Sequence, residues 1–350
     1  MGENRFFRFA EHGARKSGSP RTSFPARLRG SGADGNATAL VHRFLVLAFM
    51  LSASSCGSPL RVGHDSGATA AGGDARASDS DGMAAGGDTA AGTSVFIQIS
   101  AGYGQLCGLR KDGSVTCSGK DGYGQADPPA GTFTQIAAGG QFTCALRTDG
   151  SATCWGGNPE GAPLTPPSSH FTQISAGWDF ACGLAEDGGV TCWGANTWGQ
   201  ATPPAGSFAQ ISSGGWYTCG LRPDGSAACW GENIHGQCTP PPGFFTRIVS
   251  GMYFSCGLQA NGKATCWGDN EFDQQNFPTE TFTQIAPGGE ATCGLRANGT
   301  VACWGWQLSV GDIVSPAGTF TQLSLCDKLA CGLRTDGSVT CWGIPLTLEP

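Results

Sequence analysis

Short runs of alternating apolar and polar residues recur along most of the chain. In one such unit, residues 133–170, the segment Phe-Thr-Gln-Ile at 133–136 has the alternation and β-branched content of a strand. Two further strands are predicted at residues 143–147 and 151–156, joined by an Asp-Gly turn that is typical of a hairpin. We expect a short fourth strand in the Gly-Gln and Pro-rich segment that ends the unit. Each unit is therefore predicted to be a small antiparallel sheet.

The unit returns every 37 or 38 residues, a period typical of stacked supersecondary units. A phenylalanine keeps this step at Phe96, Phe133, Phe171, Phe208, Phe245, Phe282 and Phe320. Two cysteines with nine residues between them keep it at Cys107/Cys117, Cys144/Cys154, Cys182/Cys192, Cys219/Cys229, Cys256/Cys266, Cys293/Cys303 and Cys331/Cys341. Residues 95–350 therefore contain seven repeats of one unit.

The turn chemistry fixes the register of the hairpin. A three-residue loop with Gly150 at the left-handed position of a G1 bulge places Arg147 opposite Ser151. Counting outward, Cys144 lies opposite Cys154 at a non-hydrogen-bonded site, where facing α-carbons approach to about 4.5 Å. Each pair is therefore predicted to be a cross-strand disulfide. Zinc sites favour cysteines two to four residues apart, so no metal site is expected.

A tryptophan follows the second cysteine in six units, and the first unit has Ser118 there. These residues are Trp155, Trp193, Trp230, Trp267, Trp304 and Trp342. Strand alternation places them on the face opposite the disulfide, so both faces of the hairpin are apolar or small, as in a sheet held between two neighbours. Seven such sheets without distinct caps predict an all-β fold, a seven-bladed β-propeller with one disulfide per blade.

The composition limits which cell compartments and which classes of partner are expected. The chain has a net charge of −7 at pH 7, and the repeats are more acidic than the rest. Such a surface repels a phosphate backbone, so nucleic acid is not an expected partner. Most of the 17 cysteines stand in regular pairs, which suits an oxidising compartment rather than the cytosol.

Residues 1–94 lack the repeat pattern. We expect residues 1–40, which are rich in Arg, Ser and Gly, to be untranslated or disordered. Residues 41–55 have the outline of a bacterial lipoprotein signal peptide, which would leave Cys56 as the lipid-bearing N-terminus. Their apolar run is far shorter than the roughly 20 residues that a membrane-spanning helix needs. Residues 56–94 are predicted to be a disordered Gly/Ala/Ser/Asp linker.

The repeated unit also resembles a known family. The pattern Ala-Gly-x-x-Phe-x-Cys-x-Leu-x-x-Asp-Gly-x-x-x-Cys-Trp-Gly, nearly intact at 138–156 and 176–194, is similar to the regulator of chromosome condensation repeat family. The resemblance covers all seven units and implies a seven-bladed ring. The units are shorter than in the eukaryotic regulator and look more like secreted bacterial members, including the type II β-lactamase inhibitor protein. Unit seven departs most, with Leu325 and Cys326 at its first loop.

The two rims of such a ring differ in sequence. One rim carries the hairpin turns, with Asp-Gly or Asn-Gly at nearly every blade, and the other is irregular and aromatic. Candidate binding residues on the irregular rim are Tyr103, Trp178, Asp179, Trp216, Tyr253 and Glu290 in one loop set and Tyr123, Trp198, His235, Phe272 and Trp306 in the other. Exposed aromatics beside acids favour recognition. The alternative for any single ring is packing over a blade junction.

These observations predict a non-enzymatic, lipid-anchored binding module of the bacterial cell envelope or surface, or a secreted form of it. It is expected to be monomeric, to recognise a protein or a glycan through the aromatic rim, and to touch the membrane only through its anchor. The resemblance implies an alternative, an enzyme regulator that acts as an exchange factor or as a β-lactamase inhibitor. Catalysis has little support, because the repeats hold only His170 and His235 without recurring partners. No catalytic residue, cofactor or phosphate loop is predicted.

Overall fold

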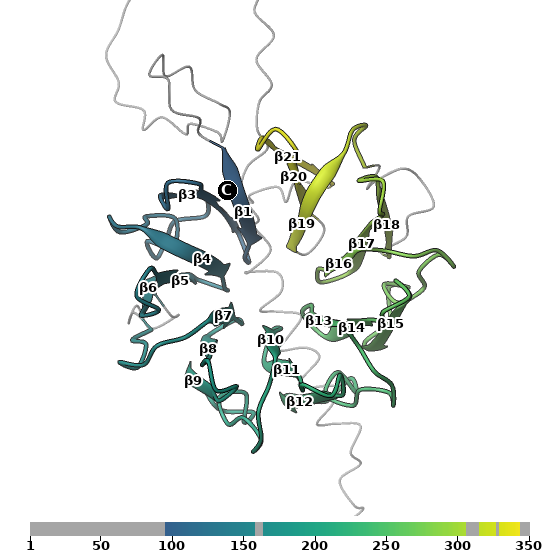
Figure 1. Ribbon diagram of the computed structural model, residues 1–350, viewed down its shortest axis with the longest axis horizontal. Coiled ribbons are helices and arrows are strands. Elements are labelled where there is room, and N and C mark those ends of the chain that lie inside the picture. Colours follow the sequence, from purple (N-terminus) through teal and green to yellow (C-terminus); the bar gives the residue numbers. More distant parts are fainter. Residues whose placement is uncertain (1–94, 158–163, 306–314, 327–328, 344–350) are drawn as a thin grey trace, which may run out of the picture. The chain divides into compact units, whose positions relative to one another are not determined.

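The computed structural model describes residues 95–157, 164–305, 315–326 and 329–343 (Figure 1). The untranslated or disordered stretch, the signal peptide, the lipidation site Cys56 and the linker predicted for residues 1–94 lie outside these ranges, as does Trp306. Within them every regular element is a strand, and no helix is long and apolar enough to cross a membrane.

Seven three-stranded antiparallel sheets follow one another along the chain, and each has its strands in sequence order. They are formed by β1 (Phe96–Ala101), β2 (Gln105–Arg110) and β3 (Val115–Gly119); β4 (Phe133–Ala138), β5 (Phe142–Arg147) and β6 (Ala152–Gly156); β7 (Gln173–Ala176), β8 (Phe180–Leu184) and β9 (Val190–Gly194); β10 (Gln210–Ser213), β11 (Tyr217–Leu221) and β12 (Ala227–Gly231); β13 (Arg247–Ser250), β14 (Phe254–Leu258) and β15 (Ala264–Gly268); β16 (Gln284–Pro287), β17 (Ala291–Leu295) and β18 (Val301–Gly305); and β19 (Phe320–Cys326), β20 (Leu329–Arg334) and β21 (Val339–Gly343). The first strand of each sheet contacts the first strands of its two neighbours, and β19 contacts β1. The sheets are therefore the blades of a closed seven-bladed propeller, as predicted (Figure 1).

The expected fourth strand is absent from the described residues. The Gly-Gln segment after the third strand forms a turn instead, in which a buried glutamine folds back on its own loop. In blade 1 the Gln125 Oε1 accepts a hydrogen bond from the Tyr123 N–H at 2.9 Å, and the turns of blades 3, 4 and 5 repeat this bond. An Asx-like turn of this kind satisfies the backbone locally, so the segment has no need of a strand partner.

Cross-strand disulfides form in all seven blades. They join Cys107 to Cys117, Cys144 to Cys154, Cys182 to Cys192, Cys219 to Cys229, Cys256 to Cys266, Cys293 to Cys303 and Cys331 to Cys341. In blade 2 the α-carbons of the facing cysteines lie 4.0 Å apart. Gly150 has a φ of 83°, as the predicted bulge requires, because that conformation is strained for residues with a side chain. The register derived from the turn and the seven predicted pairings are confirmed.

The two cysteines of a bridge differ in exposure. The first, on the middle strand of the blade, is buried in every case. The second, on the third strand, is only partly buried; these residues are Cys117, Cys154, Cys192, Cys229, Cys266, Cys303 and Cys341. The fourth strand expected from the sequence would have covered them, and that expectation is wrong for the described residues. The third strand is therefore the outer edge of its blade, and its sulfur atom lies nearer to solvent.

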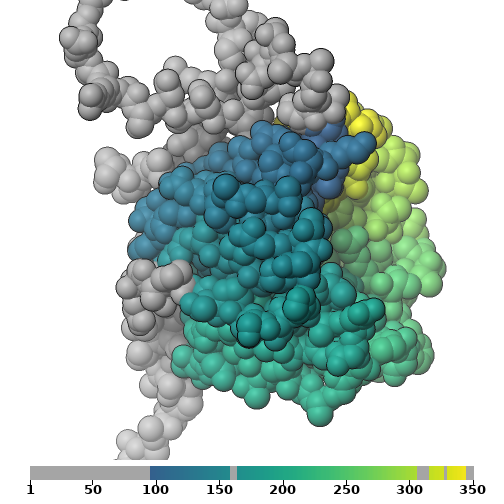
Figure 2. All heavy atoms as spheres, turned by 60° about the vertical axis from the view of Figure 1, so that its left-hand side comes forward, coloured from purple at the N-terminus to yellow at the C-terminus, as the bar shows by residue number. Residues whose placement is uncertain are grey.

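Neighbouring blades pack the disulfide face of one against the tryptophan face of the next. Between blades 1 and 2, Cys107 and Leu109 lie in one apolar cluster with Trp155. The same pairing of faces recurs at the following junctions, and the blades follow one another without a break in Figure 2. Blade 1 has Ser118 instead of a tryptophan, and Ile99 packs against the disulfide face of blade 7. The tryptophans are thus core residues, as expected.

Four of the six junction tryptophans are also tied to the turn of the preceding blade. The Trp155 indole N–H donates to the Gln125 carbonyl at 3.0 Å. Trp230, Trp267 and Trp304 make the same bond to the carbonyls of the corresponding turn glutamines. The turn that replaces the fourth strand therefore serves as the polar anchor of the next blade.

A glutamine clamp joins the first strands of neighbouring blades. In blade 4 the Gln210 amide donates to the Ile248 carbonyl of blade 5 at 2.7 Å and accepts from the Ile248 N–H at 3.0 Å. Equivalent glutamines contact the backbone of the next blade at six of the seven junctions; they are Gln98, Gln135, Gln173, Gln210, Gln284 and Gln322. The clamp covers the strand edge that faces the axis, where the backbone would otherwise lack partners.

Candidate functional site

The loops between the first and second strands meet around the axis at one rim. The loops of blades 1 to 5 each donate a backbone hydrogen bond to the next loop, as from the Tyr103 N–H to the Gly139 carbonyl at 3.0 Å and from the Trp178 N–H to the Gly215 carbonyl at 2.9 Å. The loops enclose a cavity of about 80 Å³ lined mainly by small residues at the strand ends. Ligand pockets usually measure about 300–1,000 Å³. The axial cavity is therefore too small to be the main binding site.

Five side chains on this rim form a continuous row of ring contacts, which we call the aromatic ladder. It runs from Tyr103 to Trp178, Trp216, Tyr253 and His235. The ring centroids are 4.5, 5.4, 5.8 and 5.3 Å apart in that order. Aromatic pairs at such distances attract one another beyond the effect of burial alone. The ladder therefore crosses blades 1 to 5 as one packed surface.

Gly140 explains how the ladder crosses blade 2. This glycine occupies the position of Trp178 in the loop of blade 2, and a Cβ atom there would lie 2.2 Å from the Trp178 carbonyl oxygen. No side chain fits at that distance. Because Gly140 brings no side chain into this space, Tyr103 of blade 1 reaches Trp178 of blade 3 directly.

The ladder residues differ in exposure. Tyr103, Trp178, Trp216 and His235 are half-buried, so part of each ring reaches solvent. Tyr253 is only 5% exposed and lies in contact with both Trp216 and His235. Its place in the expected set of exposed aromatics is therefore wrong: it packs beneath its neighbours and positions them.

The second predicted loop set lies in the glutamine turns. Tyr123 and Trp198 are exposed, and His235 and Phe272 are half-buried at the equivalent positions. Among them His235 alone has a ring contact with the ladder in the described residues. The turn places the others on the same rim, because the residues before them hydrogen-bond the first loops, as from the Glu232 N–H to the Trp216 carbonyl.

Charge is distributed unequally between the two rims. Among the described residues every cation except Lys120 lies at the hairpin rim or, like Arg247, at the end of a strand that faces that rim. Several of these arginines are already engaged, as Arg222 is over the Phe208 ring and Arg296 is with Glu280. The ladder rim carries the carboxylates Asp121, Asp179, Glu232, Asp269, Glu271, Asp273 and Glu290. The ladder is therefore set in a negative field.

Burial perturbs two of these carboxyl groups. It raises the pKa of Asp179 above its ordinary value, although hydrogen bonds, including one with Gln200, oppose the shift. Burial alone raises the pKa of Glu232 to about 7. Glu232 is 3% exposed, and its Oε2 accepts from Gln237 Nε2 at 3.4 Å. The burial of Glu232 was missed in the sequence, because no local pattern distinguishes it from a surface residue.

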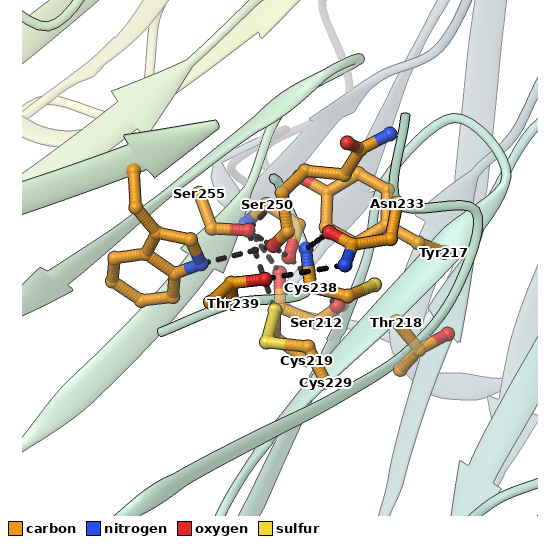
Figure 3. Close-up of a disulfide and its surroundings, with 12 residues drawn as sticks. Ser212, Tyr217, Thr218, Cys219, Cys229, Asn233, Cys238, Thr239, Ser250 and Ser255 are labelled. Carbon is orange, nitrogen blue, oxygen red and sulfur yellow. Dashed lines mark hydrogen bonds between the residues drawn. A yellow bond between two sulfur atoms is a disulfide. The ribbon is translucent and has the colours of Figure 1, made fainter. Parts of the chain in front are cut away.

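A hydroxyl network lies at the junction of blades 4 and 5, close to the Cys219–Cys229 disulfide (Figure 3). The Tyr217 hydroxyl donates to the Phe254 carbonyl at 2.6 Å and accepts from the Ser255 hydroxyl at 2.9 Å. Blades 2, 3 and 5 have a phenylalanine at the position of Tyr217. The network ties the base of the Trp216 loop to blade 5.

The cysteines outside the seven pairs do not form a reactive site. Cys238 is a free, half-buried thiol, and burial raises its pKa to about 12. A thiol with such a pKa is a poor nucleophile at neutral pH. Cys326 is buried. The described residues hold no cluster of three or more His, Cys, Asp or Glu side chains that could bind a metal ion.

Comparisons with known proteins agree with this architecture. The sequence profile of the regulator of chromosome condensation (RCC1) repeat matches residues 96–125, 133–162, 171–200, 208–237 and 245–274. These segments are the first five blades, which also carry the aromatic ladder. A search of curated proteins gave no match.

Solved structures with the same fold include two plant ectodomains. The ectodomain of the Physcomitrella patens receptor kinase CR4 is 30% identical, with a TM-score of 0.61 over 73% of this chain and 76% of that one. The CRINKLY WD40 ectodomain of the Arabidopsis thaliana receptor kinase ACR4 is 26% identical, with a TM-score of 0.60 over 71% and 98%. Prp20p of Saccharomyces cerevisiae, described with its binding to Gsp1p and histones, is 16% identical, with a TM-score of 0.56 over 73% and 83%. The likeness to Prp20p concerns the fold alone.

Proposed function

The chain belongs to the regulator of chromosome condensation repeat family, and from that premise we propose that it is a non-enzymatic, extracytoplasmic module that binds a protein through the aromatic ladder. The partner surface is proposed to be basic. The observation that carries the proposal is the ladder itself, a row of tryptophan and tyrosine rings in an acidic rim. Tryptophan, tyrosine and arginine dominate the energetics of protein interfaces.

The way in which the rings pack favours a protein over a glycan. Trp178 and Trp216 are stacked with an interplanar angle of 27°, so each covers a face of the other. A sugar-binding platform offers free ring faces, whereas this row offers edges and half-buried rings. Packed aromatics of this kind supply large contact areas at low entropic cost. Lys or Arg from a partner can approach the carboxylates around the row and the rings themselves.

The disulfides support a location outside the cytosol. Seven cross-strand bridges in one domain indicate an oxidising environment, because cytosolic reductants keep such thiols reduced. The two plant structures at 30% and 26% identity are ectodomains of receptor kinases, which agrees with an exported propeller. Regulation of an enzyme, by an exchange-factor-like or β-lactamase-inhibitor-like action, is a special case of protein binding and makes the same use of the rim.

Capture of a partner should depend on the two central rings of the ladder. We expect Trp178→Ala with Trp216→Ala to weaken capture on the order of 1,000-fold, because each of two hot-spot residues contributes about 2 kcal/mol. The measurement is a crosslinking pull-down from envelope extract with immobilised protein, followed by titration of the purified partner. Capture by wild type should also weaken with added salt.

A matched control lies on the opposite rim. Phe244 is 73% exposed there, so Phe244→Ala removes an aromatic side chain without touching the ladder. This variant should capture the partner as wild type does. Unchanged capture by the double variant, or capture that a free sugar abolishes, would contradict the proposed protein interface.

Lipid attachment at Cys56 is the remaining part of the proposal. It rests on the small residues that precede Cys56 in the sequence. We expect Cys56→Ser to move the protein from the membrane fraction to the soluble fraction, since stable anchoring by acyl chains requires the modified residue. Mass spectrometry of the N-terminal peptide checks the modification directly. A Cys56 peptide without lipid, whether free or joined to another cysteine, would refute the anchor.

A further inference from the structure

The junction between blades 5 and 6 lacks the glutamine clamp. Arg247 of β13 occupies the position of the clamp glutamine in blade 5. A glutamine amide both donates and accepts, whereas a guanidinium has five N–H donors and no acceptor. Arg247 can therefore donate to the backbone of blade 6 but cannot accept from it.

The presence of Arg247 instead of a glutamine affects the hydrogen bonding of the Ile285 backbone in β16. Ile285 faces Gly294 of β17, and the Gly288 N–H, three residues further along the chain, donates to the Ala291 carbonyl. By the alternation of an antiparallel pair, the N–H and C=O of Ile285 point away from β17 and towards blade 5. At the other junctions the clamp glutamine accepts from the equivalent N–H, as Gln210 does from Ile248 at 3.0 Å.

One buried donor, the Ile285 N–H, and one exposed donor, the Arg247 guanidinium, thus lie at this junction without an acceptor from the protein. In the described part of the chain, neither the Arg247 guanidinium nor the Ile285 N–H has a hydrogen-bond partner beyond its own sheet. Ile285 is 1% exposed, and leaving a buried N–H unpaired costs about 1–3 kcal/mol. A ligand that supplies two acceptors would remove this cost.

A second hydrogen bond between first strands, from a backbone N–H to a serine hydroxyl, is also absent between blades 5 and 6. Its absence leaves no group unpaired. Between blades 4 and 5 the Ser250 N–H donates to the Ser212 hydroxyl at 2.9 Å. At the equivalent positions between blades 5 and 6 stand Val249, which has no hydroxyl, and Pro287, which has no N–H. The acceptor and the donor of this hydrogen bond are therefore both missing, and neither is left without its partner. The Ile285 N–H is therefore the unmatched group.

We propose that the junction between blades 5 and 6 binds a small carboxylate, with one oxygen accepting from the Ile285 N–H and the other from Arg247. The first oxygen takes the place of the glutamine Oε1 at the other junctions. The second forms a charge-assisted hydrogen bond, which is about twice as strong as a neutral one. A carboxylate fits because it is planar, like the amide that it replaces, and carries the charge opposite to that of Arg247.

The surroundings of Arg247 agree with this assignment. Its side chain is exposed, so a solute can reach the guanidinium from solvent. Burial lowers the pKa of Arg247, and no described carboxylate lies close enough to offset this. The site is separate from the aromatic ladder, since Arg247 begins its strand and the ladder residues follow the ends of the first strands. The inference therefore does not depend on the proposed function.

Binding of acetate tests the site. Wild-type protein should melt at a higher temperature in sodium acetate than in sodium chloride of equal ionic strength, and calorimetry should show saturable binding to one site. Acetamide, which has the same shape without the charge, should bind at least 10-fold more weakly. A glycine tripeptide with a free C-terminus, compared with its amidated form, tests whether the site instead binds the carboxylate at the end of a peptide chain. Response to the free tripeptide but not to acetate would overturn the assignment of a small ligand.

Arg247→Gln is the decisive variant, because it restores the clamp found at the other junctions. It should fold, melt at a higher temperature than wild type in chloride, and lose the response to acetate. Arg222→Gln, which removes an arginine that stacks on Phe208 at the hairpin rim, should keep the response. Equal acetate binding by wild type and Arg247→Gln, or no saturable binding by wild type, would overturn the proposal.

Discussion

Reduction of the cross-strand disulfides is expected to unfold this protein. Each bridge joins cysteines 10 residues apart, and closing such a loop stabilises the folded state by about 2.7 kcal/mol in the chain-entropy model. Domains are stable by only about 5–15 kcal/mol in total. Loss of all seven bridges therefore removes more stabilisation than a typical domain has.

Tryptophan fluorescence and circular dichroism with increasing reductant check this expectation. The junction tryptophans, such as Trp267, are buried beside the sulfur atoms, so unfolding should shift their emission to longer wavelength. Removing one bridge with Cys256→Ala and Cys266→Ala should lower the free energy of unfolding by about 2–3 kcal/mol and leave the ring folded. Cys238→Ser removes the free thiol and should have little effect. A fully reduced and alkylated chain with the native melting temperature would contradict the argument.

The strands and disulfides could be predicted because local chemistry determines them. The Thr148–Gly150 loop fixes the hairpin register, and that register places Cys144 opposite Cys154 without reference to the rest of the chain. The closed ring followed from the repeat number and from apolar character on both faces of each sheet. These inferences require only contacts between residues close in sequence.

Features that depend on contacts about 38 residues apart could not be predicted in this way. The Gly-Gln segments are consistent with a strand by composition, and only the neighbouring blade shows that Gln125 anchors Trp155. The glutamine clamp likewise has no signature within one unit, because its partner lies in the next. Arg247 becomes informative only after the six clamps have been seen.

In the candidate site, too, local features could be predicted from the sequence and contacts between blades could not. The aromatic character of the irregular rim was evident in the sequence, and Trp178 and Trp216 do lie in contact. The contact between Tyr103 and Trp178 across blade 2 was not evident, because it depends on a glycine that lets two loops approach. The exposure of a single residue such as Tyr253 could not be predicted. Its neighbours cover it, so it supports the aromatic ladder as a buried member.

Stability is expected to fall as pH rises from about 4 to 7, because of Glu232. Burial raises the pKa of this carboxyl group to about 7, while its value in an unfolded chain is about 4.3. Below both values the group is protonated in both states and costs nothing. Between them the unfolded chain releases the proton and the folded chain retains it, so unfolding becomes more favourable. The total loss is about 4 kcal/mol and is complete above the folded pKa.

Glu232→Gln isolates this effect. The variant keeps a side chain that can accept the hydrogen bond from Gln237 but cannot ionise. In urea unfolding it should match wild type at pH 4 and exceed it by about 4 kcal/mol at pH 8. Burial also raises the pKa of Asp179, so both proteins keep some dependence on pH, and the readout is the difference between them.

Glu280→Gln is the matched control with the opposite sign. Glu280 is paired with Arg296, which lowers its pKa, so this substitution should not stabilise the protein at high pH. If wild type and Glu232→Gln differ by the same amount at pH 4 and pH 8, the pKa of Glu232 is the same in the folded and the unfolded protein, and the group is ionised in the folded protein at pH 8. In that case a buried charge lies in the turn that also carries His235, and the ladder rim is more negative at neutral pH than it is with a protonated Glu232.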